Sequence, residues 1–392
     1  MSDRLIRTAL AALALASAGF AASPARAALD PPSSGALFGF PGAFANPATP
    51  SSAAHALADR WLGDAPWDDP AAPAGDRFTL DGALFYERED RQDLHAANRE
   101  YDSGAGALDF GSVALGARLL GRWDGWVYAF RPETRYEDVA FLSGLGTDPS
   151  VPSAVVTGKT DSREVVSGGA LSAGFGGLRI GVAVEVTDRS DDWTRTLDSG
   201  DPQSGTRHTD WHGSAVGGQL GFVWTHGDSG LHRLTLGGAV RRVPKLELSG
   251  SSTTDLLVGA SDSSVTTTRE AGWEGGVSAG YQVGEAVRLI AGGGFATAMD
   301  WSGLDATTGR RAEGGLAIDY HDSETPWTVR AGYSIAQQSA VDEGHAGTLG
   351  LGFGWDFGGT VVELGGIHRS IHRPDQPGQY QDRVLLGFHA RF

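Results

Sequence analysis

Apolar and polar residues alternate one by one over many segments of this chain. In residues 178–186 every second position is aliphatic, and the positions between are small or charged. The last segment, residues 380–392, alternates in the same way and ends on Phe392. Because successive side chains of a strand point to opposite faces, such segments predict strands with one apolar and one polar face.

A turn between two of these segments tests the interpretation. Gly176-Gly177 separates residues 163–175 from residues 178–188 and has the composition of a two-residue hairpin turn. This turn would pair Phe175 with Leu178, so that the apolar faces of both strands coincide. A second Gly-Gly pair, at 358–359, gives the same agreement between its flanking segments.

The same pattern predicts fourteen strands in all. Connections after the even-numbered strands are short, and those after the odd-numbered strands are longer and rich in Ser, Thr, Asp and Gly, as in 137–162, 189–210 and 244–270. This is typical of a transmembrane antiparallel β-barrel with both termini in the periplasm. The predicted strands are 77–87, 107–119, 126–136, 163–175, 178–188, 211–225, 231–243, 271–283, 286–301, 311–321, 326–337, 346–357, 360–372 and 380–392.

The N-terminal part does not alternate and divides in two. Residues 1–27 have the charged start, apolar centre and Ala-Arg-Ala end of a secretory signal peptide. Residues 28–75 are rich in Ala and Pro, with a short helix expected over Ala53–Leu62, capped by Ser51 or Ser52. This second part is either a plug inside the barrel, residues 76–392, or a disordered periplasmic leader.

Composition narrows the function classes. The formal net charge is −17, which argues against a nucleic-acid partner. The chain has no Cys, so disulfides and thiolate chemistry are excluded. Mean hydropathy is −0.20 and no apolar run has the length of a membrane helix, but a barrel needs none, because only alternate residues face lipid.

Short motifs extend the picture to a known family. The segment before the barrel contains Asn46-Pro47-Ala48, and the third strand contains Phe130, Arg131 and Pro132. In these features, and in its fourteen strands, the chain resembles the FadL/TodX family of outer-membrane transporters for long-chain fatty acids and other hydrophobic compounds. The resemblance implies an N-terminal hatch carrying the Asn-Pro-Ala motif, and a third strand that bends inward and opens the wall beside it.

On this resemblance the protein takes up hydrophobic small molecules through a plugged barrel in the Gram-negative outer membrane and releases them sideways. Pro132 has no backbone N–H to donate to a neighbouring strand, so it is suited to a break in the third strand. Alternatively, Asn46-Pro47 is a plain turn and Pro132 marks the end of a strand. A structural or secretion-accessory barrel and a general porin are the alternative functions. No cofactor, metal or catalytic residue is expected, since none of the His residues has a spacing that forms a nucleophile–base pair.

Two further sets of residues follow from the barrel. Arg179, Arg288 and Arg330 have lumen parity and are candidates for a carboxylate head group, or else pair structurally with acidic residues on neighbouring strands. The expected partners are the hydrophobic substrate, outer-membrane lipids with lipopolysaccharide, and the barrel-assembly machinery, which would engage the last strand at Phe392. We expect a monomer.

Overall fold

The computed structural model describes residues 48–74, 78–91, 106–143, 154–198, 205–228, 232–256, 259–302, 306–308, 310–321, 325–339, 344–372 and 379–392. All of these residues belong to one compact unit. The predicted signal peptide lies outside the described residues, as do Asn46 and Pro47 of the hatch motif. Their assignments therefore remain predictions.

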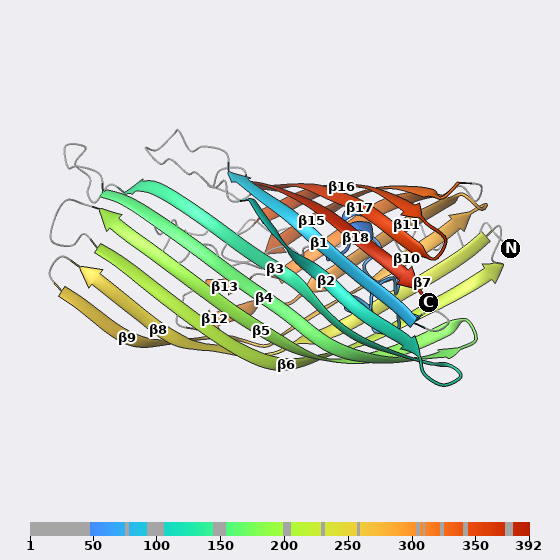
Figure 1. Ribbon diagram of the computed structural model, residues 1–392, viewed down its shortest axis with the longest axis horizontal. Coiled ribbons are helices and arrows are strands. Elements are labelled where there is room, and N and C mark those ends of the chain that lie inside the picture. The colour runs from blue at the N-terminus through green and yellow to red at the C-terminus, as the bar shows by residue number, and fades with distance from the viewer. Residues whose placement is uncertain are drawn as a thin grey trace. The chain divides into compact units, whose positions relative to one another are not determined.

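The described part of the chain is a helix turn followed by a single antiparallel sheet (Figure 1). The first strand pairs with both the second and the last, so the sheet closes on itself and leaves no edge there. The elements are α3 (Pro50–Ala54), β1 (Phe78–Arg91), β2 (Gly106–Arg118), β3 (Trp123–Ser143), β4 (Ala154–Phe175), β5 (Leu178–Asp198), β6 (Gly205–Asp228), β7 (His232–Val243), β8 (Leu246–Leu256), β9 (Gly259–Arg269), β10 (Gly272–Val283), β11 (Val287–Ala296), β12 (Met299–Ser302), β13 (Ala306–Thr308), β14 (Arg310–His321), β15 (Trp327–Ser339), β16 (Gly344–Asp356), β17 (Thr360–His372) and β18 (Gln379–Arg391).

The closed wall has fourteen strands, as the alternation predicts. Four of the eighteen elements are outer continuations of wall strands rather than additional members of the wall. The pair β8–β9 continues β7 and β10, and the short pair β12–β13 continues β11 and β14. The wall is therefore taller on the side of β4 to β9 than elsewhere, as Figure 1 shows.

The predicted hairpin registers are confirmed. Phe175 pairs with Leu178, and Trp355 pairs with Val362. Gly176 has φ +64°, a left-handed conformation that a residue with a Cβ adopts at a cost. The turn chemistry and the hydrophobic pattern thus specify the same pairing.

Three long connections predicted from the sequence are largely strand instead. The predicted loops 137–162, 189–210 and 244–270 contain the ends of β3 to β6 and all of β8 and β9. In β5 the outward-facing residues change from aliphatic to polar after Val186, beginning with Asp188. A strand that leaves the bilayer has two polar faces and loses the alternation that reveals it, so the prediction ended each strand too early.

The outer face carries a continuous apolar belt. Val184, Leu351 and Val277 expose 62%, 60% and 61% of their surface, and large exposed apolar side chains occur on nearly every wall strand. An exposed apolar surface of this extent is costly in water but matches the hydrocarbon of a bilayer. The fold and its belt are those of a Gram-negative outer-membrane barrel.

The predicted helix over 53–62 is wrong in position and length. The helix turn α3 covers Pro50–Ala54, and its N-cap is Thr49, which accepts a hydrogen bond from Ser52 N at 3.1 Å. Ala56 and Leu57 then have positive φ, which ends the helix. No helix among the described residues is long and apolar enough to cross a membrane.

Residues 48–74 form a plug whose backbone lies against glycines of the wall. At six of these positions a Cβ would overlap plug backbone, so only Gly permits the approach. We call this set the glycine seat: Gly181, Gly237, Gly292, Gly332, Gly350 and Gly365. The helix turn α3 contacts β15 to β18, and Trp61 N donates to Ser278 Oγ of β10 at 3.3 Å.

Candidate functional site

The wall is incomplete between β2 and β3. Their backbone pairing runs from Arg118–Asp124 to Ser112–Phe130 and stops there among the described residues. Beyond this point β2 pairs with β1 and β3 pairs with β4. The β3–β4 ladder itself shifts between Phe130 and Glu133, which places Arg131 and Pro132 in an irregular stretch. We call residues 106–111 of β2 and 131–143 of β3 the wall gap.

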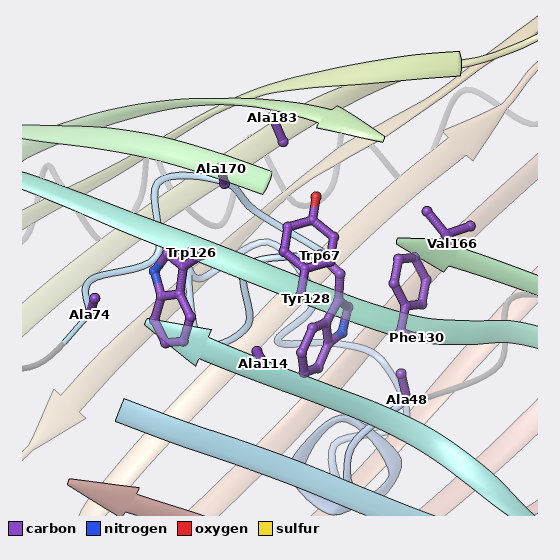
Figure 2. Close-up of a cluster of buried hydrophobic side chains, with 10 residues drawn as sticks. All are labelled: Ala48, Trp67, Ala74, Ala114, Trp126, Tyr128, Phe130, Val166, Ala170 and Ala183. Carbon is purple, nitrogen blue, oxygen red and sulfur yellow. The ribbon is translucent and has the colours of Figure 1, made fainter. Parts of the chain in front are cut away.

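A buried aromatic cluster lies beside the wall gap (Figure 2). Trp67 of the plug stacks on Phe130, with ring centroids 6.0 Å apart, and meets Tyr128 edge-on at 6.3 Å. Tyr128 donates a hydrogen bond to Glu185 at 2.9 Å. The full cluster is Ala48, Trp67, Ala74, Ala114, Trp126, Tyr128, Phe130, Val166, Ala170 and Ala183.

The described part of the plug begins at the same place. Ala48 belongs to the cluster, and its carbonyl accepts a hydrogen bond from Ser112 Oγ at 2.8 Å, at the last paired rung of β2. Arg131 forms an ion pair with Asp109, which joins β3 to β2 by side chains where their backbones do not pair. The structure thus brings together Ala48, Phe130 and Arg131 among the residues singled out in the sequence. Their role as a gate remains a prediction.

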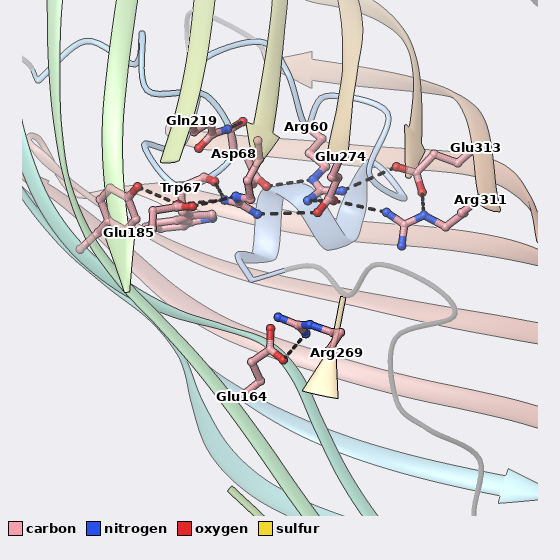
Figure 3. A network of polar contacts seen from close by, with 12 residues as sticks. Arg60, Trp67, Asp68, Glu164, Glu185, Gln219, Arg269, Glu274, Arg311 and Glu313 are labelled. Atoms are coloured by element: carbon pink, nitrogen blue, oxygen red, sulfur yellow. Dashed lines mark hydrogen bonds and ion pairs between the residues drawn. The ribbon is translucent and has the colours of Figure 1, made fainter. Parts of the chain in front are cut away.

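A layer of charged side chains fixes the plug across the lumen (Figure 3). Arg60 of the plug contacts Asp68 at 3.0 Å and Glu274 of β10 at 2.5 Å. Arg241 of β7 contacts Glu185 of β5 at 3.0 Å and also donates to the carbonyl of Trp67. We call this set the plug layer. Charges this deeply buried are stable only when paired, so the plug and wall depend on each other here.

His55 forms a second charged contact between plug and wall. Its Nδ1 lies 2.7 Å from Asp59, and its Nε2 contacts Asp319 of β14. Burial alone disfavours the charged imidazole, but the carboxylates of Asp59 and Asp319 outweigh it and raise the pKa of His55 to about 9. The imidazolium therefore holds the plug to β14 at neutral pH.

The three candidate head-group arginines are all paired. Arg179 contacts Asp124 and donates to the carbonyl of plug residue Ala71 at 3.1 Å. Arg288 lies 3.8 Å from plug residue Asp64. Arg330 lies 2.7 Å from Glu363 and 3.9 Å from Asp319. Arg288 and Arg330, with His55, line a cavity of about 340 Å³ beside the plug.

The sequence pattern does not indicate the plug contacts of Trp67, Arg60 and Arg241. Arg60 and Trp67 lie in a segment without periodicity, whose contacts depend on how it folds back onto the wall. Arg241 lies on β7 next to Arg242. The alternation of side chains along the strand places Arg241 on the lumen face, but it does not indicate which groups Arg241 contacts. The signal that could have identified the plug contacts is the recurrence of glycines on the lumen face of strands, which marks where backbone approaches backbone.

These observations define a class of protein: a fourteen-stranded outer-membrane barrel with an internal plug and an interrupted wall. No family model and no curated protein matches the chain. Among solved structures, a FadL homologue from Pseudomonas aeruginosa aligns with TM-score 0.65 at 13% identity, over 87% of this chain and 98% of that one.

The toluene transporter TbuX of Ralstonia pickettii aligns with TM-score 0.62 at 16% identity, over 88% of this chain and 98% of that one. The toluene transporter TodX of Pseudomonas putida aligns with TM-score 0.61 at 16% identity, over 88% and 96%. The chain has the fold of these FadL/TodX-type barrels over nearly their whole length.

Proposed function

We propose that this protein takes up hydrophobic small molecules across the outer membrane, and that the wall gap releases them sideways into the bilayer. The observation that carries the proposal is the loss of β2–β3 pairing directly beside a buried aromatic cluster. An apolar molecule in that cluster would have aromatic side chains on the lumen side and hydrocarbon beyond the wall. A lateral route avoids transfer through water.

The proposal includes a monomer that acts without cofactor or catalysis. The structural neighbours include the toluene transporter TbuX and the monoaromatic hydrocarbon channel CymD, which supports a transport role over an enzymatic one. For a substrate molecule to pass, the part of the plug near Ala48 and Trp67 must move. The assembly machinery would recognise the closing strand β18 through Phe392, and lipopolysaccharide would surround the apolar belt.

The experiment is a reversible staple across the wall gap. Asp109→Cys and Arg131→Cys place two thiols where the ion pair now joins β2 to β3. These are the only thiols of the variant, because the native sequence contains no Cys. A bifunctional methanethiosulfonate reagent would join them, and dithiothreitol would release them. The measurement is the initial uptake rate of oleate and of toluene in a Gram-negative host lacking its own transporter. We expect uptake to fall to the host background when stapled and to recover on reduction.

The matched control staples the paired part of the same two strands. Leu115 and Val127 are register partners on the outer face, so Leu115→Cys and Val127→Cys can be joined while the wall gap stays open. Uptake should be unchanged in this variant. Equal uptake with the gap stapled and unstapled would contradict lateral release. Wild-type uptake of both compounds at the host background would contradict the transport function itself.

A further inference from the structure

Two histidines face each other on the outer surface of the wall. His345 lies on β16 and His372 on β17, two neighbouring strands of the sheet (Figure 1), and the two residues are register partners. The centroids of their imidazole rings lie 5.0 Å apart, and the ring planes are inclined by 47°. Sequence spacing does not reveal this pair, because the two residues lie at opposite ends of the β16–β17 hairpin sequence. We call them the histidine rung.

The histidine rung lies beyond the apolar belt, at the end of the hairpin away from its Gly358-Gly359 turn. Both imidazoles are exposed and have the outward parity of Leu349, the last large apolar residue of β16 in this direction. His345 is the second outward position beyond Leu349, about 13 Å along the strand. The rung therefore meets water and polar head groups rather than hydrocarbon.

The nitrogens of the rung are available to a ligand. Neither His345 nor His372 has a hydrogen bond or an ion pair with any other described residue. His368, the neighbouring exposed histidine of β17, differs in this respect. Its Nδ1 lies 2.7 Å from Asp382, and its ring stacks on Tyr380 with centroids 5.8 Å apart. The rung is thus distinguished from an ordinary surface histidine by its lack of polar partners in the described part of the chain.

The backbone that carries the rung is held in place from the inner face. Ala346 and Ile371, the chain neighbours of the two histidines, are register partners and pack in a buried cluster with Ala336. The ladder and this cluster fix the separation of the two strands at the rung. The exposed rings can still rotate about their side-chain torsions. Two ligands are therefore positioned for one ion by the fold itself.

The separation of the rings fits the binding of one metal ion by both imidazoles. A histidine nitrogen binds Zn²⁺ at about 2.0–2.1 Å, which places the ring centre about 3.2 Å from the ion. Two such rings have centroids about 4.5 Å apart when they bind at a right angle, and about 5.2 Å apart at the tetrahedral angle. The observed 5.0 Å lies between these values. Imidazole suits Zn²⁺, Cu²⁺ and Ni²⁺, whereas Mg²⁺ and Ca²⁺ take oxygen ligands.

We propose that the histidine rung is a binding site for a divalent transition-metal ion on the outer surface of the barrel. His345 and His372 each supply one nitrogen, and water or an oxygen ligand from outside the chain fills the remaining positions. No group of three or more His, Cys or acidic side chains that could hold a metal occurs among the described residues, so the site has two protein ligands and stays open. It lies on the outer face, apart from the lumen and the plug, and does not depend on the proposed function.

The experiment titrates ZnCl₂ at pH 7 into the purified barrel in detergent, by calorimetry, with excess MgCl₂ present to occupy sites made of oxygen alone. His345→Gln and His372→Gln, singly and together, should each weaken the tightest Zn²⁺ site at least about tenfold, because one imidazole alone loses the intramolecular second contact. The electron paramagnetic resonance spectrum of bound Cu²⁺ is the second readout. Hyperfine structure from two imidazole nitrogens should be present in wild type and absent from both single variants.

The matched control is His368→Gln, which removes an exposed histidine from the same face of β17. Its Zn²⁺ affinity and Cu²⁺ spectrum should equal those of wild type, and heat-modifiable gel mobility shows whether each variant is folded. Equal Zn²⁺ binding by wild type and the double variant would mean adventitious ions only and would overturn the site. A loss in His368→Gln as large as that in His345→Gln would overturn it too. Should a variant fail to fold, a wild-type Cu²⁺ spectrum without two imidazole nitrogens would still do so.

Discussion

His55 shows how a single residue ties the plug to the wall. Its imidazolium lies between Asp59 of the plug and Asp319 of β14, and Arg288 and Arg330 are the nearby cations of the wall. Two carboxylates acting on one buried cation explain the direction of its pKa shift. A neutral imidazole can donate to only one of them, so deprotonation would weaken one contact.

The shift predicts a pH dependence of plug retention. A folded-state pKa of about 9, against an ordinary value of 6.5, means that the stabilisation is complete below about pH 6.5 and is lost as the pH rises through 9. Its size is on the order of 3 kcal/mol. We expect proteolysis of the plug by an added protease to accelerate above pH 9 in wild type. His55→Gln should be cleaved faster than wild type at pH 7 and show little further change, whereas an unchanged pH profile would contradict this role.

The glycine seat is the corresponding feature at the scale of elements. Strands of the wall present Gly where the plug crosses them, so that backbone packs on backbone. Because both partners in these contacts are backbone atoms, no flexible side chain can move aside to make room. A single added methyl group must move the plug or bend the strand, at a cost of about 1–3 kcal/mol for overpacking.

Two adjacent glycines of β17 provide the test. A Cβ at Gly365 would overlap the backbone of Pro50, whereas a Cβ at Gly366 would meet its nearest atom, Arg383 O, at 3.6 Å. We therefore expect Gly365→Ala to lower the thermal unfolding midpoint and raise the ion conductance of planar bilayers. Gly366→Ala, one residue away on the other face, should leave both close to wild type. Identical behaviour of the two variants would contradict the seat.

The sequence predicted the wall better than its contents. The alternation and Gly-Gly turns specify strand number and register because one face of each strand meets hydrocarbon. Beyond Val186 that constraint ends, so the pattern predicts a loop where the outer half of β5 lies. The plug contacts could not be predicted, because Arg60 and Trp67 have no periodicity and meet wall residues far away in the chain. The motif residue Ala48 was singled out only through the family resemblance.

At the scale of the whole molecule, charge pairs hold the plug inside the lumen. A general porin would pass ions through an open lumen, so conductance separates the two functions. We expect small conductance from wild type in planar bilayers, and a large, steady conductance after deletion of residues 48–74. The deletion variant must show the heat-modifiable gel mobility of a folded barrel for the comparison to count. A large wild-type conductance would contradict a plugged transporter.

The tall side of the wall has a consequence beyond transport. A strand needs about 9–11 residues to cross the bilayer, whereas β4, β5 and β6 have 22, 21 and 24. The outward residues of β5 and β6 become polar at the same rung, where Asp188 pairs with Ser214. Above that rung the sheet has polar residues on both faces and extends beyond the lipid. The backbone hydrogen bonds of the ladder hold these polar side chains in a fixed register, which a loop of the same length would not do.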